Sequence, residues 1–213
     1  KLLDDLGSVD LSALASAVKT ALVEKHILLY FRQPDLAAIV HQAGWDGALA
    51  SPPGDFLMVV DANMGFNKVA PAIREQIDYR VTLAPEPAAE LALTYTHLGK
   101  PRDEECRHEP YYASTILSYA ELADRCYWDY VRVFPAAGVV PLGGSRHPLA
   151  GDYLTSGRDW PGDVVVSQET DGRLSLANFF LLPWGQREVV TFRYQLPPAV
   201  VAVDGAVHRY RLL

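Results

Sequence analysis

The feature that most limits the possible folds is a series of short apolar runs with strand periodicity, which begins near Ile77. In the first two runs, Ile77–Leu83 and Leu91–Tyr95, apolar side chains alternate with other residues, as they do in a half-buried strand. Asp171-Gly172, between two later runs, is typical of a hairpin turn. The later runs are Tyr127–Phe134, Val164–Gln168, Leu174–Leu182 and Val189–Leu196. Because no strong helical pattern interrupts the series, the sequence predicts an antiparallel β-sandwich.

The N-terminal part follows a different pattern. Asp10 is suited to cap a helix, and apolar residues recur at helical spacing over Leu11–Leu22. Pro34 fits the first turn of a second helix, and Gly44 can end that helix in the left-handed conformation. The sequence therefore predicts two short helices before residue 45.

Two continuous apolar runs accompany these helices. His26–Phe31 fits a buried strand or the last turns of the first helix, and Phe56–Val60 follows the second helix. The order helix, strand, helix, strand predicts a small α/β unit in residues 1–72, which we interpret as the end of a larger domain in a parent protein. Residues 73–213 would then form an immunoglobulin-like antiparallel sandwich, and the whole chain belongs to the α+β class.

Composition and charge exclude several classes of protein. The chain has 19 basic and 26 acidic residues, a formal net charge of −7, whereas a nucleic-acid surface needs a basic stripe to meet phosphates. Apolar residues make up 49% of the chain, yet none of their runs approaches the roughly 18 residues of a membrane span. We expect a globular fragment that contains no membrane span and has no nucleic-acid partner.

The two cysteines, Cys106 and Cys126, lie in a polar, tyrosine-rich stretch outside the apolar runs. An even number of cysteines outside a core indicates one disulfide and an oxidising compartment. The alternative is a pair of free thiols in a cytosolic protein. On the chain-entropy model, closing a loop of about 20 residues stabilises the fold by roughly 3 kcal/mol.

The most organised polar segment runs from Asp61 to Lys68, directly after an apolar run. Asp61, Asn63 and Asn67 stand at odd positions around Gly65, so their side-chain oxygens can converge. Three roles are open: the side chains bond the backbone and stabilise a turn, they contact a ligand or glycan, or they bind a hard cation. With a single carboxylate and no glutamate at the twelfth position of the loop, the segment does not match an EF-hand, and Lys68 suits an anionic group better than a metal. We take these residues as candidate ligand contacts and predict no metal site.

Gly44-Trp45-Asp46-Gly47 is a second candidate. Trp45 between glycines can offer its ring to a sugar, or it can fill the junction between the two parts of the chain while Asp46 stabilises a turn. We include both residues among the candidate ligand contacts.

No motif predicts catalysis or a cofactor. The cluster Glu104–Glu109 contains Cys106 and His108, but it lacks the paired spacing of zinc ligands and the positive surroundings of a nucleophilic thiol. Ser145 stands outside a Gly-x-Ser-x-Gly context. We therefore name no catalytic residue.

Several segments together resemble the bacterial family catalogued as domain of unknown function 4012. The resemblance spans nearly the whole chain and is most specific from Gly44 to Lys68. The matching segments are Lys25–Phe31, Gly44–Gly47, Asp55–Lys68, Cys126–Tyr130 and Phe192–Pro197. Members of that family look like cell-envelope proteins with an N-terminal membrane anchor and a long extracellular portion, and this chain is similar to the later half of that portion. The family has no established catalytic residues to carry over.

These observations and the resemblance lead to one expected function. We expect a non-enzymatic, extracytoplasmic module at the cell surface that serves binding or assembly, with polysaccharide or an envelope protein as its partner. The alternative is an envelope enzyme acting on glycan or glycolipid, with a site near Asp61–Lys68 that the missing N-terminal half would complete.

Overall fold

The chain divides into two compact units in the computed structural model. The units are Lys1–Ala50 and Ser51–Leu213. The residues that the structure describes are 10–49, 54–83, 86–108, 117–170, 172–204 and 207–212.

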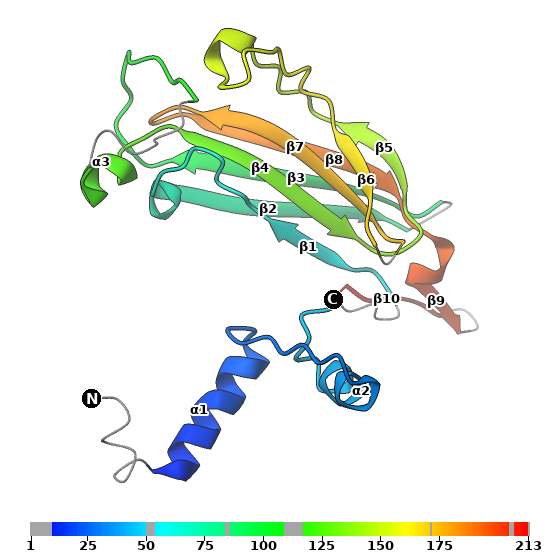
Figure 1. Ribbon diagram of the computed structural model, residues 1–213. Coiled ribbons are helices and arrows are strands. Elements are labelled where there is room, and N and C mark those ends of the chain that lie inside the picture. Colours follow the sequence, from blue (N-terminus) through cyan, green and yellow to red (C-terminus); the bar gives the residue numbers. More distant parts are fainter. Residues whose placement is uncertain are drawn as a thin grey trace. The chain divides into compact units, whose positions relative to one another are not determined.

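The first unit contains two helices, α1 (Leu11–Val23) and α2 (Pro34–Gln42), as the sequence predicts (Figure 1). The Asp10 carboxylate accepts hydrogen bonds from two N–H groups of the first turn of α1, at 2.9 and 3.3 Å, and so satisfies donors that the helix leaves open. Pro34 occupies the first turn of α2, and Gly44 follows that helix at a φ of +67°. Both expected helix boundaries are confirmed.

The expected α/β unit is wrong in two respects. His26–Phe31 is neither a strand nor part of α1: it is an irregular segment whose side chains are mostly exposed, and residues 10–49 contain no strand. The run Phe56–Val60 contains β1 (Leu57–Val60), which pairs antiparallel with β4 (Tyr127–Pro135) of the sandwich. The boundary between the units therefore lies after residue 50 and not after residue 72, because β1 hydrogen-bonds to a strand that follows it by about 70 residues.

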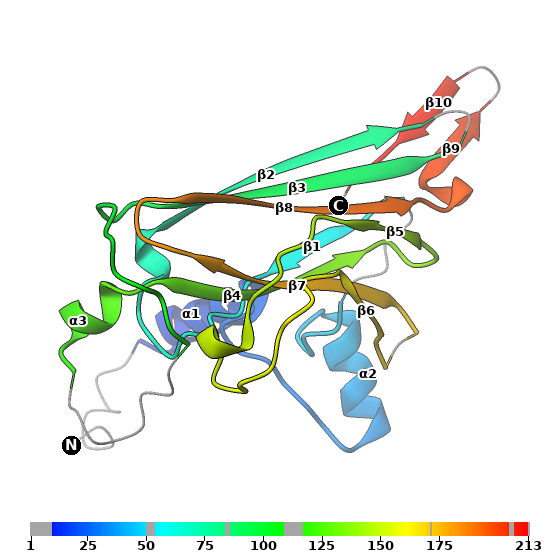
Figure 2. The same ribbon diagram turned by 90° about the horizontal axis from the view of Figure 1, so that it is seen from above.

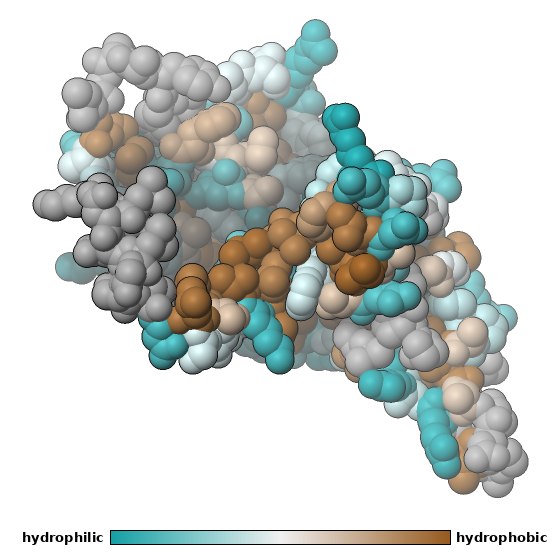
Figure 3. Space-filling view, turned by 60° about the horizontal axis from the view of Figure 1, so that its bottom comes forward, coloured by the Kyte–Doolittle hydropathy of each residue, from teal (hydrophilic) through white to brown (hydrophobic). Residues whose placement is uncertain are grey.

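The N-terminal unit buries little of its apolar surface. Leu22 and Val40 are buried, while large apolar side chains along both helices and the segment between them stay exposed. Figure 3 shows hydrophobic residues gathered in a continuous band over this unit. The exposed set is Leu11, Leu14, Val18, Val23, Ile27, Leu28, Tyr30, Phe31, Leu36 and Ile39.

The second unit is an antiparallel β-sandwich, which confirms the main prediction from the sequence. Among the described residues, one four-stranded sheet has the order β1-β4-β7-β6 and the other the order β2-β3-β8-β5, and Figure 2 shows them as two layers. The remaining strands are β2 (Ile73–Thr82), β3 (Ala88–His97), β5 (Val140–Gly144), β6 (Val165–Gln168), β7 (Leu174–Leu182), β8 (Arg187–Gln195), β9 (Val201–Asp204) and β10 (Val207–Tyr210). The last two pair as a separate ribbon. The strands β6 and β7 pair antiparallel around the expected turn, of which Asp171 lies outside the described residues.

Strand periodicity decides which side chains fill the core. On β4, Tyr127, Val131 and Val133 point between the sheets, whereas Trp128 points outward. The outward side chain is also buried, because the connections after β3 and β5 cover the outer face of this sheet. A second apolar cluster forms there from Trp128, Trp184, Cys106 and Cys126, with Leu149, Tyr153, Leu154, Phe179 and Leu181 packed against it. The first sheet thus has apolar packing on both faces.

A buried carboxylate joins the start of the sandwich to its C-terminal end. Asp55 is fully buried, and its Oδ2 accepts hydrogen bonds from the hydroxyls of Tyr79 on β2, at 2.5 Å, and Tyr210 on β10, at 2.6 Å. The backbone N–H of Asp55 donates to the carbonyl of Arg211 at 2.8 Å. Burial raises the pKa of the Tyr79 hydroxyl far above its ordinary value, so this donor keeps its proton.

Candidate ligand-binding site

Trp45 and Asp46 belong to the N-terminal unit, whereas the other candidate residues belong to the second unit. The carboxylate of Asp46 accepts hydrogen bonds from His41 Nδ1 at 2.7 Å and from the Ala48 N–H at 3.1 Å, and the bond from His41 lowers the pKa of Asp46. This geometry fits the turn-stabilising role. Trp45 lines a hollow of about 510 Å³ along α1. Its other lining residues are Leu11, Leu14, Ala15, Val18, Lys19 and Leu22.

The Asp61–Lys68 loop continues the pairing of β1 with β4. Asn63 and Asp129 form an isolated antiparallel bridge in the register of the β1–β4 pair, and the Met64 N–H donates to the Trp128 carbonyl at 2.8 Å. Since side chains alternate between the faces of a sheet, Asp61 and Asp129 point inward, whereas Met64 and Trp128 point outward. This short segment therefore contributes side chains to both the inner and the outer face of the first sheet.

The two asparagines of this loop are engaged in holding its shape. Asn63 Nδ2 donates to Asn67 Oδ1 at 2.8 Å, and Asn63 Oδ1 accepts the Gly65 N–H at 2.9 Å. Asn67 Nδ2 donates to the Cys126 carbonyl at 3.0 Å, while its Oδ1 also accepts the Val69 N–H at 3.2 Å. Of the three roles left open by the sequence, this arrangement supports turn stabilisation for both asparagines. Lys68 is exposed.

Asp61 belongs to a carboxyl cluster at the inner edge of the sandwich, together with Glu75 of β2. Tyr95 donates its hydroxyl proton to Asp61 Oδ1 at 2.6 Å, and Tyr127 donates to Asp129 Oδ1 at 3.0 Å. Asp129 is fully buried, and its Oδ2 has no hydrogen-bond donor in the described part of the chain. The carboxyl group of Asp61 lies within hydrogen-bonding reach of Asp129.

The protonation of this cluster follows from burial and like charge. Burial, together with the charge of Asp61, raises the pKa of Asp129 to about 8. Burial and Asp61 also raise the pKa of Glu75. A carboxyl group with such a pKa holds its proton at neutral pH, so Asp129 can donate a hydrogen bond to Asp61.

The outward side of the same region forms an aromatic groove of about 630 Å³. Tyr130 of β4 and Phe179 of β7 lie on its floor, because both project from the outer face of the first sheet. Met64 and His108 line one side and Trp160 lines another. The remaining lining residues are Leu154, Thr155, Ser156, Arg158 and Asp159. Such a volume lies within the range of small-molecule sites.

The aromatic rings that line the groove pack on one another and on two neighbouring rings, those of Trp128 and Phe66. Trp128 and Phe179 are stacked with ring centroids 6.1 Å apart, and Trp160 meets the Phe179 ring edge-on at 6.1 Å. His108 packs against Trp128 at 5.1 Å and is stacked with Phe66 at 6.0 Å. These contacts hold the rings in place before any ligand arrives, which lowers the entropy lost on binding.

His108 bridges the two sides of the groove. Its Nε2 donates to the carbonyl of Met64 at 2.7 Å, while the Thr155 hydroxyl contacts both its carbonyl and its Nδ1. The His108 N–H also donates to the Tyr153 carbonyl at 2.8 Å. The position of this ring therefore depends on the segment that carries it.

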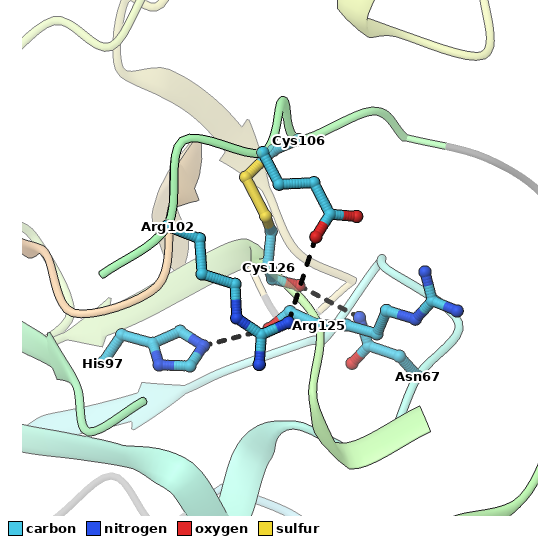
Figure 4. The surroundings of a disulfide bond; sticks show 7 residues. Asn67, His97, Arg102, Cys106, Arg125 and Cys126 are labelled. Carbon is cyan, nitrogen blue, oxygen red and sulfur yellow. Dashed lines mark hydrogen bonds and ion pairs between the residues drawn. A yellow bond between two sulfur atoms is a disulfide. The ribbon is translucent and has the colours of Figure 1, made fainter. Parts of the chain in front are cut away.

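The disulfide between Cys106 and Cys126 fixes that segment, and it confirms the pairing that the sequence predicts (Figure 4). The two Cα atoms are 6.0 Å apart, and both cysteines are buried. Next to the bond, His97 Nε2 donates to the Arg125 carbonyl at 2.9 Å and Asn67 donates to the Cys126 carbonyl at 3.0 Å. The bond thus joins the start of β4 to the chain two residues before His108.

Three side chains elsewhere have the atomic pairing of a hydrolase triad. Ser145 Oγ lies 2.8 Å from His147 Nε2, and His147 Nδ1 lies 3.3 Å from Glu188 Oε1. However, Ser145 Oγ accepts the Thr191 N–H at 2.8 Å as part of the contact with β8, and His147 packs against the buried ring of Phe180. Neither the groove nor the hollow along α1 is lined by these residues. The geometry fits a partly buried structural network better than an activated nucleophile.

The groove was missed by sequence reasoning because its residues come from five separated segments of the chain. One signal was present: the run Tyr127–Phe134 is apolar or aromatic at both odd and even positions, which is typical of a strand covered on both faces. Within the described ranges, no group of three or more His, Cys, Asp or Glu side chains could hold a metal ion. The helices described for this chain are too short or too polar to cross a membrane.

Comparisons of the chain with protein-family models, with curated proteins and with solved structures found no match.

Proposed function

We propose that this chain is a non-enzymatic, extracytoplasmic binding module of the cell envelope and that its aromatic groove binds a polysaccharide segment. The observation that carries the proposal is the groove itself. It combines aromatic rings held in place by mutual packing with a polar rim, in a volume of about 630 Å³.

The chemistry of a saccharide matches both parts of the groove. A sugar ring has an apolar C–H face that packs on an aromatic ring, and its edge carries hydroxyl groups that need hydrogen-bond partners. The Tyr130 hydroxyl and the Arg158 guanidinium make no hydrogen bond or ion pair with any described residue, so both can serve a ligand. Thr155 and Ser156 add hydroxyl groups to the same rim.

The disulfide supports the extracytoplasmic part of the proposal, because such bonds persist in oxidising compartments. The proposed membership of the family catalogued as domain of unknown function 4012 agrees with that location. The acidic formal charge of −7 agrees with a partner other than nucleic acid.

The strand order supports the proposed immunoglobulin-like character of the sandwich. Immunoglobulin domains place strands A, B, E and D in one sheet and strands C, F and G in the other. If β4 to β8 are taken as strands B to F, the order β1-β4-β7-β6 corresponds to A-B-E-D, and β5 lies beside β8 as C lies beside F. The place of strand G is taken by β3, which comes earlier in the chain.

The positions of the Asp61–Lys68 side chains favour a binding function over a catalytic one. The asparagines of the Asp61–Lys68 loop use their polar atoms within the loop or on neighbouring backbone, and neither Asp61 nor Lys68 lines the groove. Ser145 supplies a direct test of the enzymatic alternative. We expect a fluorophosphonate probe to leave Ser145 unmodified in peptide mass spectrometry of the native protein. Labelling that the variant Ser145→Ala abolishes would contradict the non-enzymatic assignment.

Removing an aromatic side chain from the groove should weaken saccharide binding. Neutral and acidic oligosaccharides of about two to six sugar units are screened by tryptophan fluorescence, and the ligands found are titrated calorimetrically. We expect Tyr130→Ala and Trp160→Ala each to weaken binding by about tenfold or more, as central aromatic contacts commonly do. The control is Tyr30→Ala, which changes an exposed tyrosine of the other unit.

The outcome of this screen is decisive in two ways. Equal affinity in the wild type and in both groove variants would place the binding site elsewhere. Failure of every oligosaccharide to bind would overturn the proposed ligand class. Far-UV and near-UV circular dichroism verify that each variant is folded before its affinity is compared.

A further inference from the structure

Two neighbouring carboxyl groups, that of the fully buried Asp129 and that of the exposed Asp61, lie behind one side of the groove. Asp61 and Asp129 lie on the inner face of the first sheet, while Met64 and Tyr130, on the same two paired segments, line the groove on its outer face. Two backbone hydrogen bonds hold these segments together: Met64 N–H to the Trp128 carbonyl at 2.8 Å, and Tyr130 N–H to the Ala62 carbonyl at 3.0 Å. Attraction or repulsion between the two carboxyl groups therefore acts, through these paired segments, on the side chains that line the groove.

We propose that Asp61 and Asp129 share one proton and that this proton is a pH-dependent clamp, which holds the Asp61–Lys68 loop against β4. The hydrogen-bond partners of the two groups leave one carboxyl oxygen that can carry this proton. Asp129 Oδ1 accepts from Tyr127 and Asp61 Oδ1 accepts from Tyr95, so the unpartnered Oδ2 of Asp129 is the oxygen that carries the proton and donates it to Asp61. The fully buried position of Asp129 gives its proton no competing path to water.

Loss of the proton would replace an attraction by a repulsion. If Asp129 ionised, it would be a buried negative charge beside the carboxylate of Asp61, and the two like charges would repel each other. The titratable groups that interact with Asp129 are Asp61 from the loop, Tyr95 from β3 and Tyr127 from its own strand. Glu75 of β2 interacts with Asp61, and all of these groups are acids. His147 is already paired with Glu188. Because the loop is the smaller element, we expect it to separate from β4 when Asp129 ionises.

The direction of the pH dependence follows from proton linkage. In an unfolded chain Asp129 has its ordinary carboxyl pKa of 3.8, whereas in the folded protein its pKa is raised by burial first and by Asp61 second. Between about pH 4 and pH 8 the folded state therefore binds one more proton than the unfolded state, so raising the pH favours unfolding. The contribution of the clamp is complete below about pH 4 and is lost as the pH rises through this window.

A consequence for the ligand rests on the proposed function. When the loop leaves β4, Met64 and the carbonyl that receives the His108 hydrogen bond move away from the groove. We expect saccharide affinity to fall as the pH rises past 8. The clamp itself needs no ligand and is tested without one.

The decisive comparison is between the wild type and Asp129→Asn. The Asn side chain keeps an oxygen to accept from Tyr127 and an N–H to donate to Asp61, so it imitates the protonated acid at every pH. Urea unfolding is followed between pH 5 and pH 9, and the protection of the Met64 amide against hydrogen exchange is measured by NMR over the same range. Asp152→Asn, at an exposed position, is the matched control.

We expect the wild type and Asp152→Asn to lose urea resistance as the pH rises from 5 to 8, and Asp129→Asn to show much less of this loss. Protection of the Met64 amide should fall by up to tenfold for each pH unit between pH 5 and pH 8 in the wild type, level off above the Asp129 transition, and stay constant in Asp129→Asn. Equal pH slopes in all three proteins, or titration of the Asp129 carboxyl carbon near pH 4, would overturn the clamp. If the clamp holds but no saccharide binds, the proposed function alone is wrong.

Discussion

Asp55→Ala is expected to lower the free energy of unfolding of the sandwich by about 4 kcal/mol, because a buried acceptor is removed while its donors stay buried. Two tyrosine hydroxyls, from Tyr79 and Tyr210, would lose their hydrogen bond to this carboxylate. In a unit of this size, such a loss lowers the melting temperature by roughly 10 °C. Urea unfolding and differential scanning calorimetry measure both quantities.

Two further variants provide the loss of unfolding free energy with which that of Asp55→Ala is compared. Tyr210→Phe removes one hydroxyl and leaves the carboxylate in place, so we expect a loss of about 1 kcal/mol. Asp78→Ala removes a carboxylate of β2 whose partner is the exposed side chain of Gln76, so we expect less than about 0.5 kcal/mol. If Asp55→Ala were no less stable than Asp78→Ala, the buried network would not be what fixes the C-terminal segment.

The second large effect is expected from the disulfide. The double variant Cys106→Ala/Cys126→Ala should be about 3 kcal/mol less stable than the oxidised protein, since the bond closes a loop with a sequence separation of 20. It should also bind the groove ligand more weakly, because His108 follows Cys106 by two residues and bridges Met64 and Thr155. Urea unfolding gives the stability and calorimetric titration gives the affinity.

Reduction provides the matched control for this variant. A thiol reductant should destabilise the wild type by a similar amount and leave the double variant unchanged. Mass spectrometry of the unreduced, denatured protein should show no alkylated cysteine. Two free, alkylatable thiols in that experiment would remove the main physical support for an oxidising compartment.

Local signals in the sequence predicted the elements that depend on local physics. Asp10, Pro34 and Gly44 marked helix boundaries correctly, because capping and backbone conformation are decided within one turn. Period-two runs marked the main strands, because side-chain alternation is built into a strand. The Cys106–Cys126 bond followed from the even number of cysteines, although both are buried in an apolar cluster and do not lie outside a core.

Features that depend on distant pairing could not be predicted in this way. The sequence of Phe56–Val60 does not indicate whether its partner strand lies in the preceding segment or is β4, which begins at Tyr127. The prediction of an α/β unit was wrong for this reason. For the same reason the sequence singled out Asp61 as part of an organised polar segment, but not its neighbour Asp129. The roles of Asn63 and Asn67 were decided by the carbonyl of Cys126 and by their mutual bond.

The Asp55 network also sets an order for folding. Its carboxylate accepts a hydrogen bond from the Tyr210 hydroxyl across a separation of 155 residues. In the same way, β3 can pair with β8 only after that much later strand has been synthesised. Pairings between such distant segments lose loop entropy before they gain contacts, so they form late and slowly. A chain emerging from a ribosome or a translocation pore cannot complete the sandwich until Tyr210 has been released. Until then its strand edges stay unpaired, which leaves a long interval in which a chaperone can bind.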